Sequence, residues 1–126
     1  MDDFPRSLTI QIFNSSAANI TVNYGVLTGG SWAPAPVPGT MIPSTGQQSY
    51  VNGAPNTFSS LGGQIVLTPA SGGTIIPIWS WPADGRVSGS VNTASVNGLS
   101  ATSQLINTQT NYATLQVIIS NAHTFG

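Results

Sequence analysis

The chain has 126 residues, of which 4% are charged, and its formal net charge at pH 7 is -1. Two basic residues provide neither an electrostatic footprint for nucleic acid nor a basic face for anionic lipid. The absence of cysteine excludes disulfides, a thiolate nucleophile and cysteine metal sites. The length suits one domain with a hydrophobic core, which we place at residues 7–126, after a short polar segment at residues 1–6.

The first two predicted elements form a β-hairpin. Residues 7–13, SLTIQIF, alternate apolar and polar side chains, as a strand with one buried face does. Residues 20–27, ITVNYGVL, follow the same pattern, and the apolar face contains Ile20, Val22, Tyr24 and Val26. The intervening NSSAAN is rich in turn residues. Asn14 and Asn19 match the pattern of glycosylation acceptors, but we interpret both as turn residues.

The next part of the chain is irregular. Residues 28–43 hold repeated prolines, which lack the backbone donor that an interior strand needs, so we predict a loop or a broken edge strand. Residues 47–51, QQSYV, predict a short strand. Residues 52–63, NGAPNTFSSLGG, predict a long polar loop.

The second half again predicts strands. Residues 64–69 and 74–81 flank ASGG and indicate another hairpin, in which Pro77 favours an edge position or a bulge. Residues 86–96 alternate weakly, and residues 112–120, YATLQVIIS, form a closing strand.

These elements predict an all-β fold, an antiparallel β-sandwich of about seven to nine short strands with almost no helix. Period-two alternation assigns one set of side chains to the core. The predicted inward residues are Leu8, Ile10, Ile12, Ile20, Val22, Ile65, Leu67, Ile76, Ile78, Leu115, Val117 and Ile119.

Catalytic side chains are scarce. The sequence has no Glu, Lys or Cys, and His123 lies close to the end of the chain. Asp2 and Asp3 are adjacent near the other end, which leaves Asp84 as the one internal carboxylate. No nucleophile elbow and no metal-binding spacing occurs. We therefore expect a protein that is not an enzyme and that uses neither a cofactor nor a metal.

The order of several motifs resembles the aegerolysin family. These motifs are LTIQIFNSS, LTGGSW, SSLGGQIVL and IWSWPADG. The resemblance implies a small β-sandwich that binds membrane lipid without catalysis and serves as the small component of a pore-forming or insecticidal toxin with a larger partner. Two departures are the missing charged surface and Ala83, which stands where the family often has an aromatic residue.

The stretch with two tryptophans is the strongest candidate for a binding site. Alternation places Trp79 and Trp81 on one face, opposite Ile76 and Ile78. We predict that the isoleucines face the core and that the tryptophans face an exposed surface. The turn that follows carries Asp84 and Arg86. These two side chains either recognise a ligand or serve only to cap the turn and pair with each other.

A neutral surface rich in hydroxyls, tryptophan and tyrosine suits a zwitterionic membrane interface. The residues predicted to contact a lipid headgroup or a glycan are Trp32, Tyr50, Trp79, Trp81, Asp84 and Arg86. One alternative is a lectin for neutral glycans, because aromatic, amide and hydroxyl side chains also bind sugars. A second alternative is a self-assembling structural protein, because a net charge near zero favours homo-oligomers.

The beginning of the sequence, MDDFPRSLTIQIF, lacks the long apolar stretch of a secretory signal. We expect synthesis as a soluble intracellular protein that is released later to act at target membranes.

Overall fold

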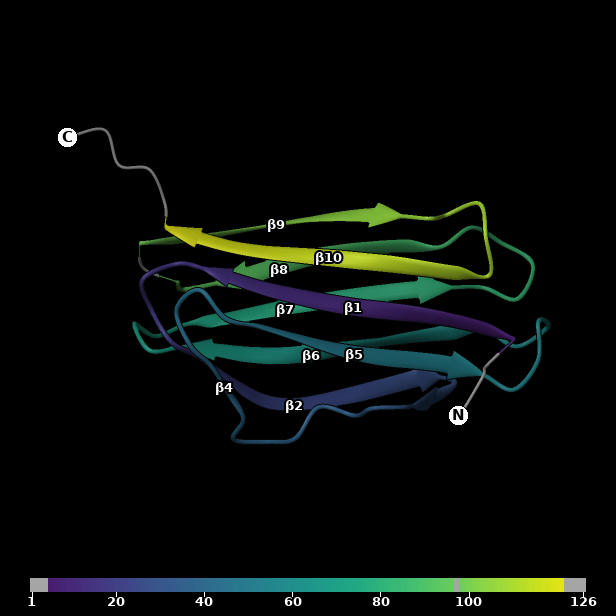
Figure 1. Ribbon diagram of the computed structural model, residues 1–126, viewed down its shortest axis with the longest axis horizontal. Helices are drawn as coiled ribbons and strands as arrows, with labels where there is room; N and C mark the ends of the chain where they lie inside the picture. Colours follow the sequence, from purple (N-terminus) through teal and green to yellow (C-terminus); the bar gives the residue numbers. More distant parts are fainter. Residues whose placement is uncertain (1–4, 97, 122–126) are drawn as a thin grey trace.

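The computed structural model describes residues 5–96 and 98–121, which form two stacked β-sheets (Figure 1). The strands are β1 Arg6–Ser15, β2 Ile20–Gly29, β3 Ser31–Trp32, β4 Met41–Ile42, β5 Gln47–Ala54, β6 Leu61–Pro69, β7 Thr74–Trp81, β8 Ser88–Ala94, β9 Leu99–Ile106 and β10 Tyr112–Asn121. In these two ranges no helix is long and apolar enough to cross a membrane. Asp2, Asp3 and His123 lie outside the described residues.

The predicted β-sandwich is confirmed. One sheet has the order β3-β5-β1-β10-β9 and the other has the order β4-β2-β6-β7-β8. The described residues form ten strands, which is more than the predicted seven to nine, because β3 and β4 are short two-residue strands and no strand was predicted at β9. All neighbours are antiparallel except β1 and β10, which pair in parallel from Ser7 opposite Tyr112 to Ser15 opposite Ser120.

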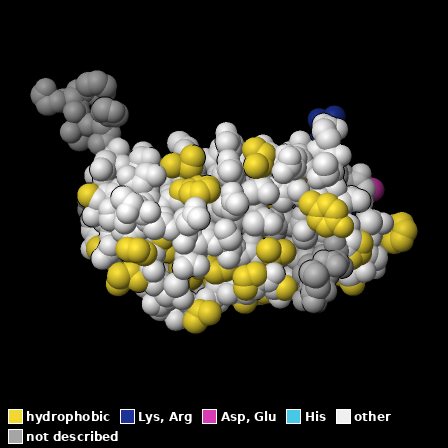
Figure 2. Space-filling model, viewed as in Figure 1, with side chains coloured by type: hydrophobic (Ala, Val, Ile, Leu, Met, Phe, Trp, Pro, Cys, Tyr) yellow, Lys and Arg dark blue, Asp and Glu magenta, His cyan; other side chains and the backbone are white. Residues whose placement is uncertain are grey.

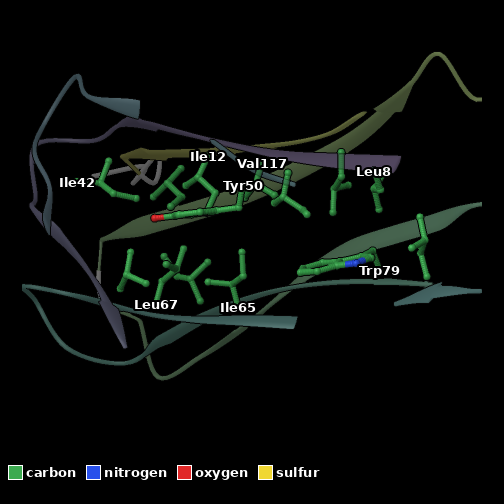
Figure 3. Packing of buried hydrophobic residues seen from close by; sticks show 14 of the residues in the cluster. Leu8, Ile12, Ile42, Tyr50, Ile65, Leu67, Trp79 and Val117 are labelled. Carbon is green, nitrogen blue, oxygen red and sulfur yellow. The ribbon is translucent and has the colours of Figure 1, made fainter. Parts of the chain in front are cut away.

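The core lies between the two sheets and is built from the alternating apolar residues (Figure 3). Most predicted inward residues are fully buried, namely Leu8, Ile10, Ile12, Ile20, Val22, Ile65, Leu67, Leu115, Val117 and Ile119. Burial of these side chains is the main force that holds the sheets together.

In β7 the predicted orientation is wrong. Trp79 and Trp81 are only 3% and 5% exposed, whereas Ile78 is 37% exposed and Ile76 is partly exposed. The isoleucines Ile76 and Ile78 share the outer face with Thr74 and Ser80, whereas the tryptophans share the inner face with Ile75 and Pro77. The larger side chains turn inward because they remove more apolar surface from water. A glycine makes room, since Trp79 pairs with Gly63 on β6, where a Cβ would lie 3.0 Å from the Trp79 ring.

In β2 a register shift reverses the alternation. Pairing with β6 shifts between Val22 and Tyr24, so Tyr24 and Val26 point outward instead of sharing the face of Ile20. A bulge of this kind inserts one residue and flips every later side chain to the other face. The predicted common face of this strand is therefore wrong after Val22.

Pro77 was expected at an edge or a bulge, but β7 lies inside its sheet between β6 and β8. The recorded β6–β7 pairs stop at Gln64 with Ile78 and resume in the same register at Leu67 with Ile75. This gap fits a residue that has no N–H to donate.

Asn14 was predicted to be a turn residue, but it lies within β1 and pairs with Ile119 of β10. Its side chain is buried and donates from Nδ2 to the carbonyl oxygens of Ala18, Ile42 and Pro43 at 2.7, 3.0 and 3.1 Å. These bonds tie the β1–β2 turn to the segment that follows β4.

Candidate functional site

Three loops gather at one end of the sandwich, where β5, β7 and β9 end (Figure 1). We call this end the loop end and define it by residues 55–60, 82–87 and 107–111. The described charged side chains belong to it: Asp84 and Arg86 lie in its second loop, and Arg6 binds two of its loops. In Figure 2 the blue and magenta atoms accordingly lie together at one end of the surface.

Arg6 holds the loop end together. Its guanidinium is almost fully buried and donates from Nη1 to the carbonyl oxygen of Ser59 and from Nη2 to that of Pro82, both at 3.0 Å. It also lies over the Trp81 ring, 4.2 Å from the ring centroid, in a cation–π contact. Burial lowers the pKa of Arg6 from its ordinary value. The side chain thus joins β1 to two loops that are distant in sequence.

A second buried polar group lies beneath the loops. Asn52 is fully buried, and its Nδ2 donates to the carbonyl oxygen of Gly29 at 2.9 Å. Its Oδ1 accepts from the backbone N–H of Gly62 and from Trp79 Nε1, both at 3.0 Å. Trp32 contacts Trp79 edge to face, with ring centroids 5.8 Å apart. These contacts fix the tryptophans as a rigid base for the loop end.

Two aromatic side chains stand out from this base. Phe58 is 81% exposed in the β5–β6 loop, and Tyr112 is 55% exposed at the start of β10. The loop around Phe58 is ordered by Asn56, whose Oδ1 accepts from the Phe58 backbone N–H at 2.9 Å and from Ser59 Oγ at 3.0 Å. Sequence reasoning missed both aromatics. The available signal for Phe58 was a single aromatic residue within an otherwise polar loop.

Asp84 and Arg86 are exposed and make no ion pair with each other or with any other described residue. The interpretation that they pair is therefore wrong, and the turn is closed by the Gly85 N–H bond to the Pro82 carbonyl oxygen at 3.3 Å. Arg86 borders a hollow of about 280 Å³ that is also lined by Val87, Thr108 and Gln109.

The predicted contact residues thus separate into two groups. Asp84 and Arg86 are at the surface of the loop end, and Trp32 is partly exposed. Trp79, Trp81 and Tyr50 are buried, with exposed fractions of 3%, 5% and 4%. Trp79 and Trp81 support the loop end from below, whereas Tyr50 lies in the core between the sheets (Figure 3).

The outer face of the β4-β2-β6-β7-β8 sheet has a larger hollow of about 550 Å³. Val26, Gln64, Ile78 and Ser90 form one row across its strands, by their recorded pairing. The hollow is further lined by Thr28, Ser80 and Ser88. Its side chains are uncharged: the apolar groups of Val26, Ile78 and the buried Trp79 lie among hydroxyls and an amide.

The described residues contain no group of three or more His, Cys, Asp or Glu that could hold a metal ion. Asp84 is isolated from other acidic side chains within these residues, so the loop end has no paired carboxylates for acid–base chemistry. Among the described residues, the loop end offers exposed aromatic rings, hydroxyls, backbone groups and the exposed guanidinium of Arg86.

Comparison with known proteins gives a likeness of fold. No protein-family model and no curated protein sequence matches the chain. The crystal structure of the lipid binding protein Nakanori superposes with a TM-score of 0.79 at 12% identity, covering 94% of this chain and 73% of Nakanori. IP-1A from Alcaligenes faecalis gives a TM-score of 0.69 at 14% identity, covering 95% of this chain and 94% of IP-1A. The chain therefore shares its β-sandwich fold with a lipid binding protein and with IP-1A.

Proposed function

We propose that the protein is a non-enzymatic module of the aegerolysin type that binds lipid membranes with its loop end. The observation that carries the proposal is the 81% exposed ring of Phe58, presented on an ordered loop above a rigid base. The fold that the chain shares with a lipid binding protein supports it.

Each part of the loop end has a role in this proposal. Phe58 enters the boundary between headgroups and acyl chains, where its apolar surface leaves water. Tyr112 lies at headgroup level, with its ring in the apolar zone and its hydroxyl in the wet zone. Arg86 donates to headgroup oxygens, and Asp84 faces a choline or amine group. Arg6 keeps the loops in place, so that little conformational entropy is lost on binding.

The resemblance of motif order supports a further part of the proposal. The chain acts as the small component of a pore-forming or insecticidal toxin: it supplies the contact with the membrane, and a larger partner supplies the pore. It is made as an intracellular protein and meets its target membrane after release.

The test is co-sedimentation with neutral phosphatidylcholine vesicles, with and without sphingolipid and sterol. Wild-type protein should bind, and Phe58→Ala should weaken binding by about 1–2 kcal/mol, which is roughly tenfold. Val37→Ala is the matched control, because Val37 is also an exposed apolar loop residue but lies outside the loop end. Wild-type protein that ignores all these vesicles would overturn the proposal, as would equal effects of the two variants.

A sugar ligand is the competing outcome of the same experiment. Soluble neutral glycans should leave vesicle binding unchanged and should give no signal with the protein alone. If glycans bind and vesicles do not, the protein is a lectin instead.

A further inference from the structure

Strand β9 leaves one edge of a sheet open. Among the described residues it shares a ladder only with β10, in unbroken antiparallel register from Leu99 opposite Asn121 to Ile106 opposite Thr114, while β8 of the other sheet lies close to it without pairing. In Figure 1 it runs along the border of the molecule. In an antiparallel pair, every second residue directs its backbone N–H and C=O away from its partner, so β9 presents a row of these groups at the edge.

Natural sheets usually guard such an edge with charges, proline, a bulge or a very short strand. None of these devices occurs in β9, whose eight residues are LSATSQLI. The opposite edge of the same sheet is β3, which has two residues and is followed by Pro34 and Pro36. The contrast within one sheet marks β9 as the edge that is free to pair.

A ladder of glutamine amides also ends at β9. Gln104 Nε2 donates to Gln116 Oε1 at 2.7 Å, and Gln116 Nε2 donates to Gln11 Oε1 at 3.1 Å. The ladder thus crosses β9, β10 and β1 on their outer face. At its open end, Gln104 is exposed and keeps a carbonyl oxygen and one N–H without a bond to any other described residue. An amide with one donor and one acceptor left is complementary to a copy of itself.

The inward side of β9 is incompletely covered. Leu99, Ala101 and Leu105 pack against the core but remain only partly buried, unlike Leu115 on the neighbouring strand, which is fully buried. A further strand beside β9 would cover these three side chains.

We propose that β9 is a self-association edge, at which a second copy of the chain pairs its own β9 in antiparallel orientation. The two sheets become one continuous sheet through both molecules, with the Gln104 amides close to the symmetry axis. A strand paired antiparallel with itself satisfies two-fold symmetry, because both chains then use the same surface. The described charges oppose this pairing little, since Arg6, Asp84 and Arg86 belong to the loop end and the two loop ends point in opposite directions.

The first test is sedimentation velocity over a wide range of protein concentration. Wild-type protein should dimerise, and Gln104→Lys should raise the dimer dissociation constant roughly tenfold or more, because it places two ammonium groups together at the interface. Asn92→Lys is the matched control: it adds the same charge at an exposed position of β8, the edge of the other sheet, and should dimerise like wild type. Circular dichroism of both variants checks that they are folded.

Hydrogen exchange of the wild-type protein gives an independent readout. The amides of β9 that point away from β10 should be protected at high concentration and exchange freely at low concentration, while β8 should not change. Monomeric wild-type protein at every concentration would overturn the proposal. Equal dissociation of the two lysine variants would do so too, as would concentration-dependent protection in β8 instead of β9.

Discussion

Tyr50 places a phenol in the core of the sandwich. Its side chain is buried between the sheets, and its hydroxyl has no hydrogen-bond partner among the described residues (Figure 3). A buried hydroxyl that leaves water without gaining a partner costs about 1–3 kcal/mol. The ring itself contributes apolar area to the core, so the residue combines a stabilising part with a destabilising one.

The variant Tyr50→Phe should separate these two parts. It keeps the ring and removes the unpaired hydroxyl, so we expect the free energy of unfolding to rise by about 1 kcal/mol. Urea denaturation followed by tryptophan fluorescence measures the change. A clear loss of stability would show that the hydroxyl has a partner that stabilises the fold.

Tyr50 also predicts how stability depends on alkaline pH. Burial raises the pKa of Tyr50 above its ordinary value of 10.0. The unfolded chain therefore loses the phenol proton at a lower pH than the folded chain does. The contribution of Tyr50 to stability is fully present below pH 10 and is lost as the pH rises through the folded-state value. Between pH 8 and pH 11 the free energy of unfolding should fall more steeply with pH for wild type than for Tyr50→Phe. An equal pH dependence of the two proteins would contradict the assignment.

Single residues of the site were only partly predictable. Asp84 was correctly placed in a turn, with Arg86 just after it, because Asp-Gly is a strong local signal. Arg6 was assigned to a polar segment at residues 1–6, whereas in the structure it begins β1 and is buried. Its partners, Ser59 and Pro82, are distant in sequence, so local patterns carry no information about this contact.

At the scale of the element, β7 shows what alternation does and does not decide. The period of two predicted the strand, but both of its faces carry large apolar side chains, and the outer face differs by the two hydroxyls of Thr74 and Ser80. Which face of β7 points into the core depends on the neighbouring strands. They place glycines opposite Trp79 and the Asn52 amide within hydrogen-bond distance of its indole N–H. Neither neighbour was identifiable before the pairing was known.

A matched pair of substitutions tests the orientation of β7. Ile75→Ala should lower the free energy of unfolding by about 2–5 kcal/mol, because Ile75 is fully buried. Ile78→Ala removes the same atoms from the outer face and should cost less than about 1 kcal/mol. Chemical denaturation of both proteins measures the difference. Equal losses would mean that the outer face of β7 is covered in solution.

Other elements were missed for similar reasons. The bulge in β2 follows from pairing with β6, and nothing in ITVNYGVL indicates it. Strand β9 alternates small hydroxyl and weakly apolar residues, so its hydrophobic signal is low. It is a strand because its backbone pairs with β10 over its whole length, from Leu99 to Ile106.

At the scale of the whole molecule, composition and turn spacing predicted the sandwich, but not the order of strands. The parallel contact between β1 and β10 joins segments from opposite ends of the described chain. The loop end is likewise assembled from three loops that are far apart in sequence. The sequence could therefore indicate which types of side chain form the site, but not which of them lie together on one surface.

The low charge of the whole molecule predicts how membrane binding responds to salt. The net charge is -1, so binding to neutral vesicles displaces few counterions. Affinity should change by less than about twofold between low and high salt. Co-sedimentation at several salt concentrations is the measurement. A large loss at high salt would show that Asp84 and Arg86, rather than Phe58, dominate the contact.

The parallel pair of β1 and β10 also determines when the chain is able to fold during its synthesis. Strand β1 leaves the ribosome before the other described strands, and β5 later covers one of its edges. Its other edge has no partner until Tyr112–Asn121 has emerged. The sheet that contains β1 is therefore completed only after β10 has been synthesised, and the nascent chain holds Leu8, Ile10 and Ile12 in an unfinished core until then.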